Sequence, residues 1–372
     1  MRIEIKEVST RGDLEKFIRL PWKLHRDHKN WAPPLLMDEW GYFSPKKNRN
    51  FGHSDTILLL AYKGNELVGR VIGIINKRFN LESGEDNARF GFLETDEDIE
   101  TAKALLTKVE VWAKEKGMKK LVGPMGFTDQ DPEGFIVEGF KGEPTIATYY
   151  NFEYMPKFLD KLGYKKEVDY FSYQIDITKP YPPIYDKVIA RTSKNNYELI
   201  EPKSTKEIKP LIIPLLTLMN ETFAPHIYGY VSLTEQEMQE FAARYLPVLD
   251  PRFVKVVKKG DDFVGFIVGI PNMDPGFRKA NGKLFPFGLF HLMSASKKSK
   301  QLDLMLGAIK STERSKGVDA IMGKAMHDSA RNAGMTVIDS HVELESNVKV
   351  RAEMERAGGK VFRRYRIFQK HL

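Results

Sequence analysis

Cysteine is absent from this chain of 372 residues. Its absence excludes disulfide bonds, thiolate metal sites and a cysteine nucleophile. Long apolar runs are also missing. The longest apolar runs, such as 56–61 and 211–219, are far shorter than the roughly 20 residues of a membrane-spanning helix. The N-terminus alternates apolar and polar residues like a strand and lacks the apolar stretch of a signal peptide. We therefore expect a cytoplasmic protein. Peripheral contact with a membrane is compatible with the sequence.

Metal-ligand patterns are lacking as well. The chain has eight histidines, none of them in a pattern such as HxxxH on one helix, so we predict no metal site. Its net charge of +8 favours anionic partners such as nucleic acid, anionic lipid or a phosphorylated cofactor. The basic segment 363–366 lies in an expected strand, where neighbouring side chains point to opposite faces. This alternation argues against a nucleic-acid partner.

The chain contains an internal repeat. KGNELVGRVIGIIN starts at Lys63 and KGDDFVGFIVGIPN at Lys259, 196 residues later. At the same offset, Asn151 and Asn347 each open a short amphipathic helix that ends at glycine and precedes a strand. Both hairpin segments show the polar turn between apolar strands that is typical of paired strands. The repeat predicts two copies of one α/β unit.

The expected elements give the domain boundaries. We predict an N-terminal domain over 1–178, a proline-rich linker over 179–195 and a C-terminal domain over 196–372. Strands alternate with helices in both copies, which indicates a mixed sheet in each. The helices are expected at 13–25, 98–116, 208–223, 234–245, 289–298 and 317–333, and the strands near 3–8, 89–94, 120–122, 302–309 and 336–341, besides the two hairpins.

The element order resembles that of the GNAT (Gcn5-related N-acetyltransferase) fold, once per copy. That family carries the motif Arg/Gln-x-x-Gly-x-Gly/Ala before a helix, where backbone amides bind the pyrophosphate of coenzyme A. The second copy has RSKGVDA in this position, with Asp319 in place of the small residue. The resemblance therefore implies that acetyl-CoA or a longer acyl-CoA binds at Arg314, Ser315, Lys316, Gly317, Val318 and Ala320. The equivalent segment of the first copy, 94–100, is acidic and lacks glycine, so we expect no pyrophosphate there.

Further segments resemble a bacterial family of tandem GNAT-like proteins that is related to the bacterial ceramide synthases, which N-acylate a sphingoid base. These segments are PPL at 33, NRNF at 48, VGR at 68, GF at 91, GP at 123, EGF at 133, EGF at 138 and YRIF at 365. The family implies an amine acceptor, small or lipidic.

Direct attack of an amine on a thioester needs a base and oxyanion donors but no covalent intermediate. In the second copy we favour Glu345 and Asp303 as the base over Asp339 and His341. Asn347 is expected to contact the cofactor, to cap its helix, or both. Many GNAT enzymes place a tyrosine acid seven residues further on, where this chain has Met354, with Phe158 at the same position in the first copy.

The glycine-rich, aromatic insert 123–150 is interpreted as the lining of an acceptor or lipid groove together with Trp31 and Trp40, or as a lid between the copies. The first functional hypothesis is an acyl-CoA-dependent N-acyltransferase. The alternatives are a non-catalytic pseudo-acyltransferase that binds acyl-CoA or a protein partner and, more weakly supported, an aminoacyl-tRNA-dependent transferase.

Overall fold

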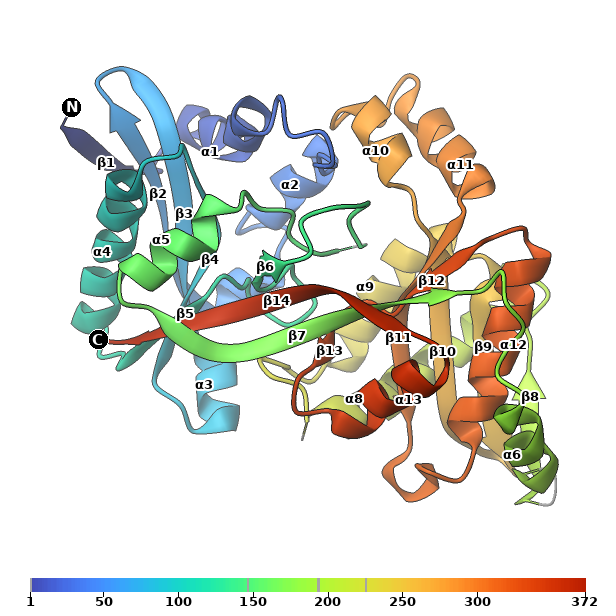
Figure 1. The fold of residues 1–372 in the computed structure, drawn as a ribbon. Coiled ribbons are helices and arrows are strands. Elements are labelled where there is room, and N and C mark those ends of the chain that lie inside the picture. The colour runs from blue at the N-terminus through green and yellow to red at the C-terminus, as the bar shows by residue number, and fades with distance from the viewer. Residues whose placement is uncertain (1, 146, 193–194, 225) are drawn as a thin grey trace. The chain divides into compact units, whose positions relative to one another are not determined.

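A computed structural model describes residues 2–145, 147–192, 195–224 and 226–372 (Figure 1). The chain divides into two compact units. Unit 1 contains the residues up to Tyr170, then Met273–Ala295 and Arg363–Leu372, and unit 2 contains Phe171–Asn272 and Ser296–Phe362. Each unit is described by itself.

The sheet of unit 1 has the strand order β1-β2-β3-β4-β5-β14, with β6 beside β14. All of these neighbours are antiparallel except the pair β4–β5. The strands are β1 (Ile3–Glu7), β2 (Ser54–Lys63), β3 (Glu66–Asn76), β4 (Asn87–Thr95), β5 (Lys120–Gly123), β6 (Phe135–Glu138) and β14 (Lys360–His371).

The sheet of unit 2 repeats this pattern. Its order is β8-β9-β10-β11-β12-β7, again antiparallel except for one pair, β11–β12, and β13 lies beside β7. The strands are β7 (Lys165–Asp176), β8 (Tyr197–Ile200), β9 (Val254–Lys259), β10 (Asp262–Pro271), β11 (Gln301–Ile309), β12 (Val337–Asp339) and β13 (Glu343–Leu344). The shared pattern of two mixed sheets confirms the predicted fold class.

The closing strands are exchanged between the two copies of the repeat. β7 ends the first copy in sequence but pairs with β12, and β14 ends the second copy but pairs with β5. The hairpin of α10 (Asp274–Ala280) and α11 (Gly288–Lys298) comes from the second copy, and its residues 273–295 pack in unit 1. The compact units are therefore assembled from discontinuous segments and do not coincide with the contiguous ranges 1–178 and 196–372.

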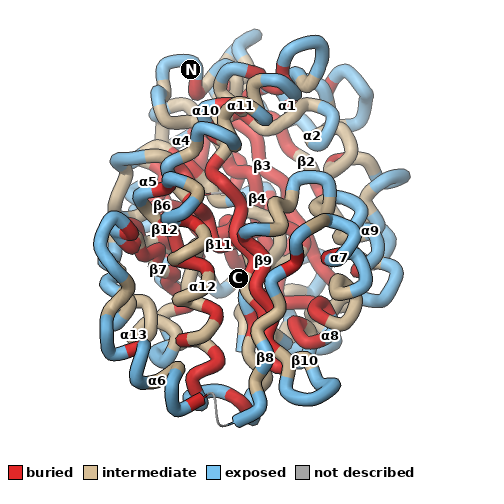
Figure 2. The backbone as a smooth tube through the Cα atoms, turned by 90° about the vertical axis from the view of Figure 1, so that its right-hand side faces the viewer, coloured by how far each residue is buried: buried red, intermediate tan, exposed pale blue. Residues whose placement is uncertain are grey.

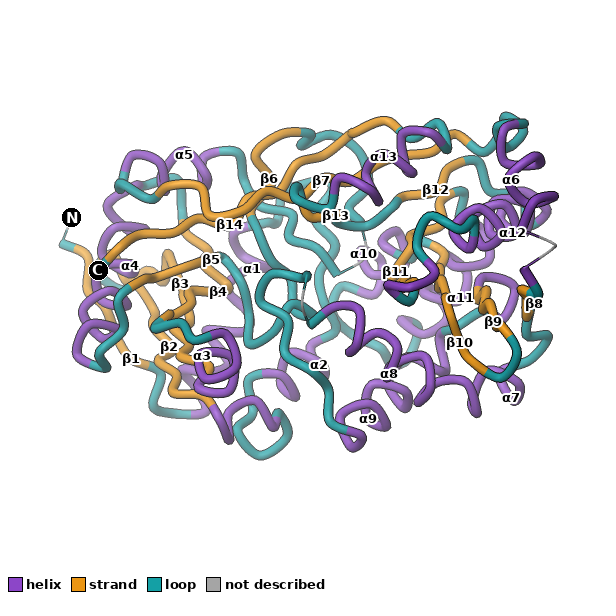
Figure 3. The backbone as a smooth tube through the Cα atoms, turned by 90° about the horizontal axis from the view of Figure 1, so that it is seen from below, coloured by secondary structure: helices purple, strands orange, loops and turns teal. Residues whose placement is uncertain are grey.

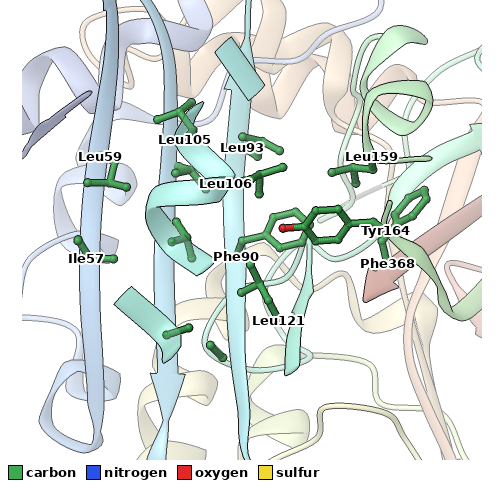
Figure 4. Packing of buried hydrophobic residues seen from close by; sticks show 14 of the residues in the cluster. Ile57, Leu59, Phe90, Leu93, Leu105, Leu106, Leu121, Leu159, Tyr164 and Phe368 are labelled. Atoms are coloured by element: carbon green, nitrogen blue, oxygen red, sulfur yellow. The ribbon is translucent and has the colours of Figure 1, made fainter. Parts of the chain in front are cut away.

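Helices cover both faces of the unit 1 sheet, and β3 and β4 are buried along nearly their whole length (red in Figure 2). α4 (Ile99–Glu115) packs over β3 and β4 on one face, and α1 (Arg11–Leu24) packs on the other. Figure 4 shows Leu105 and Leu106 of α4 packed against the strand residues Leu59 and Leu93. The remaining helices of unit 1 are α2 (Leu36–Tyr42), α3 (Lys77–Ser83) and α5 (Tyr154–Lys161).

Unit 2 has the same layers. α12 (Val318–Asn332) packs on one face of β9 and β10, where Val318 and Met322 meet Val257 and Val264. α8 (Ile212–Phe223) covers the opposite face with a separate apolar cluster. The other helices are α6 (Ile184–Thr192), α7 (Thr205–Ile208), α9 (Glu235–Tyr245) and α13 (Val348–Arg356).

A glycine of the repeat has the same packing role in both units. A Cβ atom on Gly69 of β3 would lie 2.9 Å from Leu105 Cδ1 of α4. A Cβ atom on Gly265, its counterpart 196 residues later, would lie 2.8 Å from Val318 Cγ1 of α12. Both distances are shorter than van der Waals contact, so only glycine lets the helix pack this closely on the strand.

Two segments differ from the sequence-based expectation. The proposed linker 179–195 contains α6, because Pro182 and Pro183 stand just before its first turn, where a proline is tolerated; residues 193 and 194 lie outside the described residues. The insert after β5 is mostly loop, with β6 as its strand (Figure 3). Its residues Met125, Phe127 and Phe135 belong to the core of unit 1 rather than to an open groove.

Candidate functional site

The parallel strands of unit 2 stay paired over only three residues. Gln301, Leu302 and Asp303 of β11 pair with residues 337–339 of β12, and β11 then runs on to Ile309 without β12 beside it. A register shift of β11 against β10 follows at once, between Val268 and Gly269 of β10. Unit 1 repeats the arrangement, since β4 pairs with β5 only over 87–89 and then continues to Thr95.

Asp303 and Asp339 form the last pair before this separation, and both are buried. The carboxylate of Asp303 accepts hydrogen bonds from Asn272 Nδ2 at 2.9 Å and from Gln301 Nε2 at 2.6 Å. Asp339 accepts one from the backbone nitrogen of His341 at 3.0 Å. The structure thus places three of the four predicted acid–base candidates together, with both oxygens of Asp303 already engaged.

Glu345 and Asn347 lie further along, between β13 and α13. The carbonyl oxygen of Glu345 accepts a hydrogen bond from Arg351 Nη1 at 3.2 Å. Asn347 is half-buried and precedes α13, but its side chain makes no capping hydrogen bond, so the capping role expected for it is wrong. The backbone at Asn347 (φ −81°, ψ 60°) departs from the extended conformation that capping residues usually adopt.

Glu343 on β13 is a candidate that the sequence reasoning missed. Burial raises the pKa of its carboxyl group to about 8. A carboxyl with a pKa near the working pH can both accept and return a proton. No signal in the sequence distinguishes Glu343 from Glu345, because the desolvation that raises the pKa of Glu343 comes from the surrounding fold and not from a local motif.

The turn before α12 has the shape of an anion-binding loop. Ser315 and Gly317 adopt left-handed backbone conformations (φ 60° and 87°), and no side chain caps the helix that begins at Val318. Arg314, Ser315 and Lys316 are exposed, while Gly317, Val318 and Ala320 are buried. Unpaired amides at a helix N-terminus attract anions, and the two basic side chains add to that attraction.

One side of this turn is covered by α6. A Cβ atom on Gly317 would lie 2.3 Å from Thr192 Cγ2 and 3.0 Å from Val188 Cγ1. Acidic groups are close as well, since burial and the neighbouring Asp319 carboxylate raise the pKa of Glu353 on α13. A ligand at this turn must therefore contact the exposed side, where residues 314–316 lie.

The corresponding helix start in unit 1 is already occupied by carboxylates. Asp98 accepts a hydrogen bond from the backbone nitrogen of Glu100 at 3.0 Å and so caps α4. Lys63 lies 2.6 Å from Asp96 and 2.7 Å from Asp98. These carboxylates would repel a diphosphate at this helix start, so the absence of a pyrophosphate site in unit 1 stays a prediction.

Unit 1 instead contains a chain of three titratable side chains. Glu94 Oε2 on β4 lies 3.0 Å from His25 Nε2, and His25 Nδ1 lies 2.9 Å from His28 Nδ1. Both imidazoles stack on Phe152 with ring centroids 4.5 Å apart. His25 is buried and His28 is half-buried, so the chain runs from the strand toward the surface.

The protonation of this chain follows from its electrostatics. Burial raises the pKa of Glu94, but the charge and hydrogen bond of His25 and the charge of Arg70 outweigh burial and leave this pKa below its usual value. Burial, and next the nearby His25, lowers the pKa of His28 to about 4. At neutral pH the His28 ring is therefore uncharged, and one of its two nitrogens is a hydrogen-bond acceptor. Which nitrogen of each ring donates depends on the tautomer.

This cluster was not predicted, because Glu94 is 69 residues from His25 in the sequence. Its signal is the spacing of His25 and His28, which are three residues apart. Among the described residues, no group of three or more histidine, aspartate or glutamate side chains has the geometry to hold a metal ion. Within the same residues, none of the helices combines the length and the apolar character needed to cross a membrane.

Comparisons with known proteins agree with the fold. No family model matches the chain. Two curated proteins match over nearly their whole length: "Bacterial ceramide synthase" of Caulobacter vibrioides (26% identical, covering 100% of this chain and 98% of that protein) and "Protein YghO" of Escherichia coli (24%, covering 99% and 95%).

Solved structures match in the same way. A tandem GNAT protein from the clavulanic acid biosynthesis pathway has a TM-score of 0.56 at 12% identity, covering 100% of this chain and 98% of that one. A GCN5-related N-acetyltransferase from Sphaerobacter thermophilus has a TM-score of 0.55 at 10% identity, covering 99% and 95%. Together with the repeated mixed sheet, these matches show that the chain is a tandem GNAT-fold protein.

Proposed function

We propose that this chain is an acyl-CoA-dependent N-acyltransferase that binds coenzyme A at the turn of unit 2. The supporting observation is the combination of the short β11–β12 pairing with an uncapped helix start at the end of β11. Asp303 and Ile309 are six residues apart on β11, so the strand separation and the turn are about 20 Å apart. An extended ligand with a diphosphate at one end and a thioester at the other matches this spacing.

The proposed reaction is a direct transfer. A protein base takes a proton from the acceptor ammonium, and the free amine attacks the thioester carbonyl. The carbon–sulfur bond then breaks, and the proton lost from nitrogen goes to the thiolate, which gives an amide and free coenzyme A. Glu345 and Asp303 remain the proposed bases, and Glu343, with its raised pKa, is added to them.

The acyl group and the acceptor are proposed from the relatives. The curated protein that is 26% identical bears the name ceramide synthase, which supports a fatty acyl donor and a long-chain amine acceptor. The structures at lower identity are named as acetyltransferases, which supports acetyl-CoA. Both donors therefore belong in the test.

A non-catalytic role in ligand binding is the second candidate, and the acidic groups beside the turn favour it. The carboxylates of Asp319 and Glu353 oppose a diphosphate, and Thr192 covers part of the turn. This candidate predicts that acyl-CoA binds without release of its thiol.

Titration calorimetry with acetyl-CoA and palmitoyl-CoA tests binding. The variant R314A/K316A is expected to bind about tenfold or more weakly, because each cation removed takes a charge-assisted contact with it. The variant R331A is the matched control, since Arg331 is exposed at the opposite end of α12. The proposal is wrong if neither donor binds, or if both variants bind like the wild type.

Thiol release in the presence of an amine panel, including a sphingoid base, tests catalysis. The chain has no cysteine, so a thiol reagent reads only the coenzyme A that is released. Donor binding without thiol release for any amine would favour the non-catalytic role.

A further inference from the structure

The α10–α11 hairpin is held firmly on unit 1. The backbone nitrogen of Leu36 on α2 donates to Gly282 O at 2.9 Å, and a Cβ atom on Gly282 would lie 2.7 Å from Trp22. Arg278 on α10 forms an ion pair with Glu143 at 2.7 Å. The helices lie side by side (Figure 1), since a Cβ atom on Gly276 would lie 2.8 Å from His291 O. The segment between the two helices is therefore presented on a fixed base.

This hairpin exposes an unusual number of large apolar side chains. Five of the twelve exposed large hydrophobic residues among those described fall within 285–293. They are Phe285 (71% exposed), Phe287 (69%), Leu289 (45%), Phe290 (69%) and Met293 (53%). We call these five residues the apolar tip. Single exposed hydrophobic residues are ordinary, but a contiguous group marks a surface that contacts another apolar phase.

The charges that flank the apolar tip along the chain have one sign. Between Asp274 and Asp303 the sequence contains no acidic residue. The basic residues of this stretch are Arg278, Lys279, Lys283, Lys297, Lys298 and Lys300. Lys279 and Lys283 are exposed on one side of the tip along the chain, and Lys297 and Lys298 are exposed where α11 ends.

We propose that the apolar tip inserts into the surface of a membrane that contains anionic lipid, with the flanking lysines bound to its headgroups. Apolar side chains enter the boundary between headgroups and acyl chains, and nearby basic residues strengthen the contact. Charge favours an anionic membrane over a second copy of the chain as the partner of the apolar tip. Two such hairpins would bring lysines together around their tips, and each chain already carries a net charge of +8.

The proposed membrane contact does not depend on the proposed acyl transfer, because it is argued only from the exposure and charge of the hairpin. If the proposed function also holds, the same contact gives the protein access to acceptors or donors dissolved in the membrane. Vesicle binding and transferase activity are measured separately, so either proposal can fail while the other holds.

Sedimentation with vesicles tests the proposal, using phosphatidylcholine alone or mixed with phosphatidylglycerol. The wild-type chain is expected to sediment with the mixed vesicles, and F285S/F287S/F290S to show a partition coefficient at least tenfold lower. K279Q/K283Q is expected to lose about fivefold per lysine on mixed vesicles and nothing on the neutral ones. The matched control is L81S, since Leu81 is 86% exposed and stands outside the tip.

The melting temperature of each variant, measured without vesicles, checks that the fold is intact. The proposal is overturned if the wild-type chain ignores anionic vesicles, or if the triple variant binds them as well as L81S does. It is also overturned if light scattering shows a wild-type dimer that the triple variant converts to a monomer while vesicle binding is unchanged. The tip would then be a contact between copies.

Discussion

Replacing Gly317 with alanine tests how α6 meets the turn before α12. Gly317 has φ 87°, and a left-handed conformation costs an alanine about 1–2 kcal/mol. The added methyl would also lie 2.3 Å from Thr192 Cγ2. Thr192 is buried and its hydroxyl donates to Ile189 O at 2.8 Å, so its side chain cannot turn away without losing that bond. Overpacking of this kind costs about 1–3 kcal/mol.

The free energy of unfolding is therefore expected to fall by about 2–5 kcal/mol in G317A. Urea denaturation followed by circular dichroism measures it. G358A is the matched control, because Gly358 has φ 90° but a Cβ atom there would meet nothing within 4 Å. G358A should lose only the stability that corresponds to the left-handed backbone conformation. T192A in the background of G317A should recover about 1 kcal/mol or more through the coupling between the two sites. Equal losses in G317A and G358A would refute the packing of α6 against the turn.

Three further predictions concern the charged groups of unit 1. The pKa of His28 is about 4 in the fold and near 6.5 in an unfolded chain, so stability is lost as pH falls from 6.5 to 4. Allowing for partial exposure, we expect the loss of unfolding free energy between pH 6.5 and 4 to be about 1–2 kcal/mol smaller in H28Q than in the wild type. Melting temperature against pH measures this difference. Burial, followed by the charge of Asp129, raises the pKa of Glu133, so stability falls as pH rises above the usual glutamate pKa. E133Q should therefore melt higher than the wild type at pH 8, and an equal or lower melting point would contradict a neutral Glu133. R366A should cost about 3 kcal/mol in urea denaturation, because it breaks a bidentate pair (2.7 and 2.9 Å) with the buried Asp169. R19A, whose partner Glu15 is exposed, should cost less than about 0.5 kcal/mol, and similar losses in the two variants would speak against a special role for burial.

Much of the fold was readable from local patterns. The apolar periodicity of α4 and α12 and the hairpins at 63 and 259 follow from neighbouring residues, and the structure confirms them. The alternation predicted for residues 363–366 also appears, since Arg363 is buried while Arg364 and Arg366 form ion pairs with Glu138 and Asp169. These features need no knowledge of distant contacts.

The candidate site was less predictable because its properties depend on burial. Asp303 and Asp339 are 36 positions apart, and only the pairing of β11 with β12 brings them together. Glu343 and Glu345 look alike in sequence, yet burial raises the pKa of Glu343 to about 8. The Glu94–His25–His28 chain joins a strand to a distant helix end, and no local pattern predicts that junction.

The sequence by itself determined that the chain holds two copies of one α/β unit, because hydrophobic period, turn glycines and the repeat are properties of residues close together. Only the tertiary structure decided where each copy's closing strand pairs. β7 lies beside β12 and β14 beside β5, although either strand has a pattern that would suit its own copy. A strand's sequence specifies which face is apolar, but its partner is chosen by the packing of the whole unit.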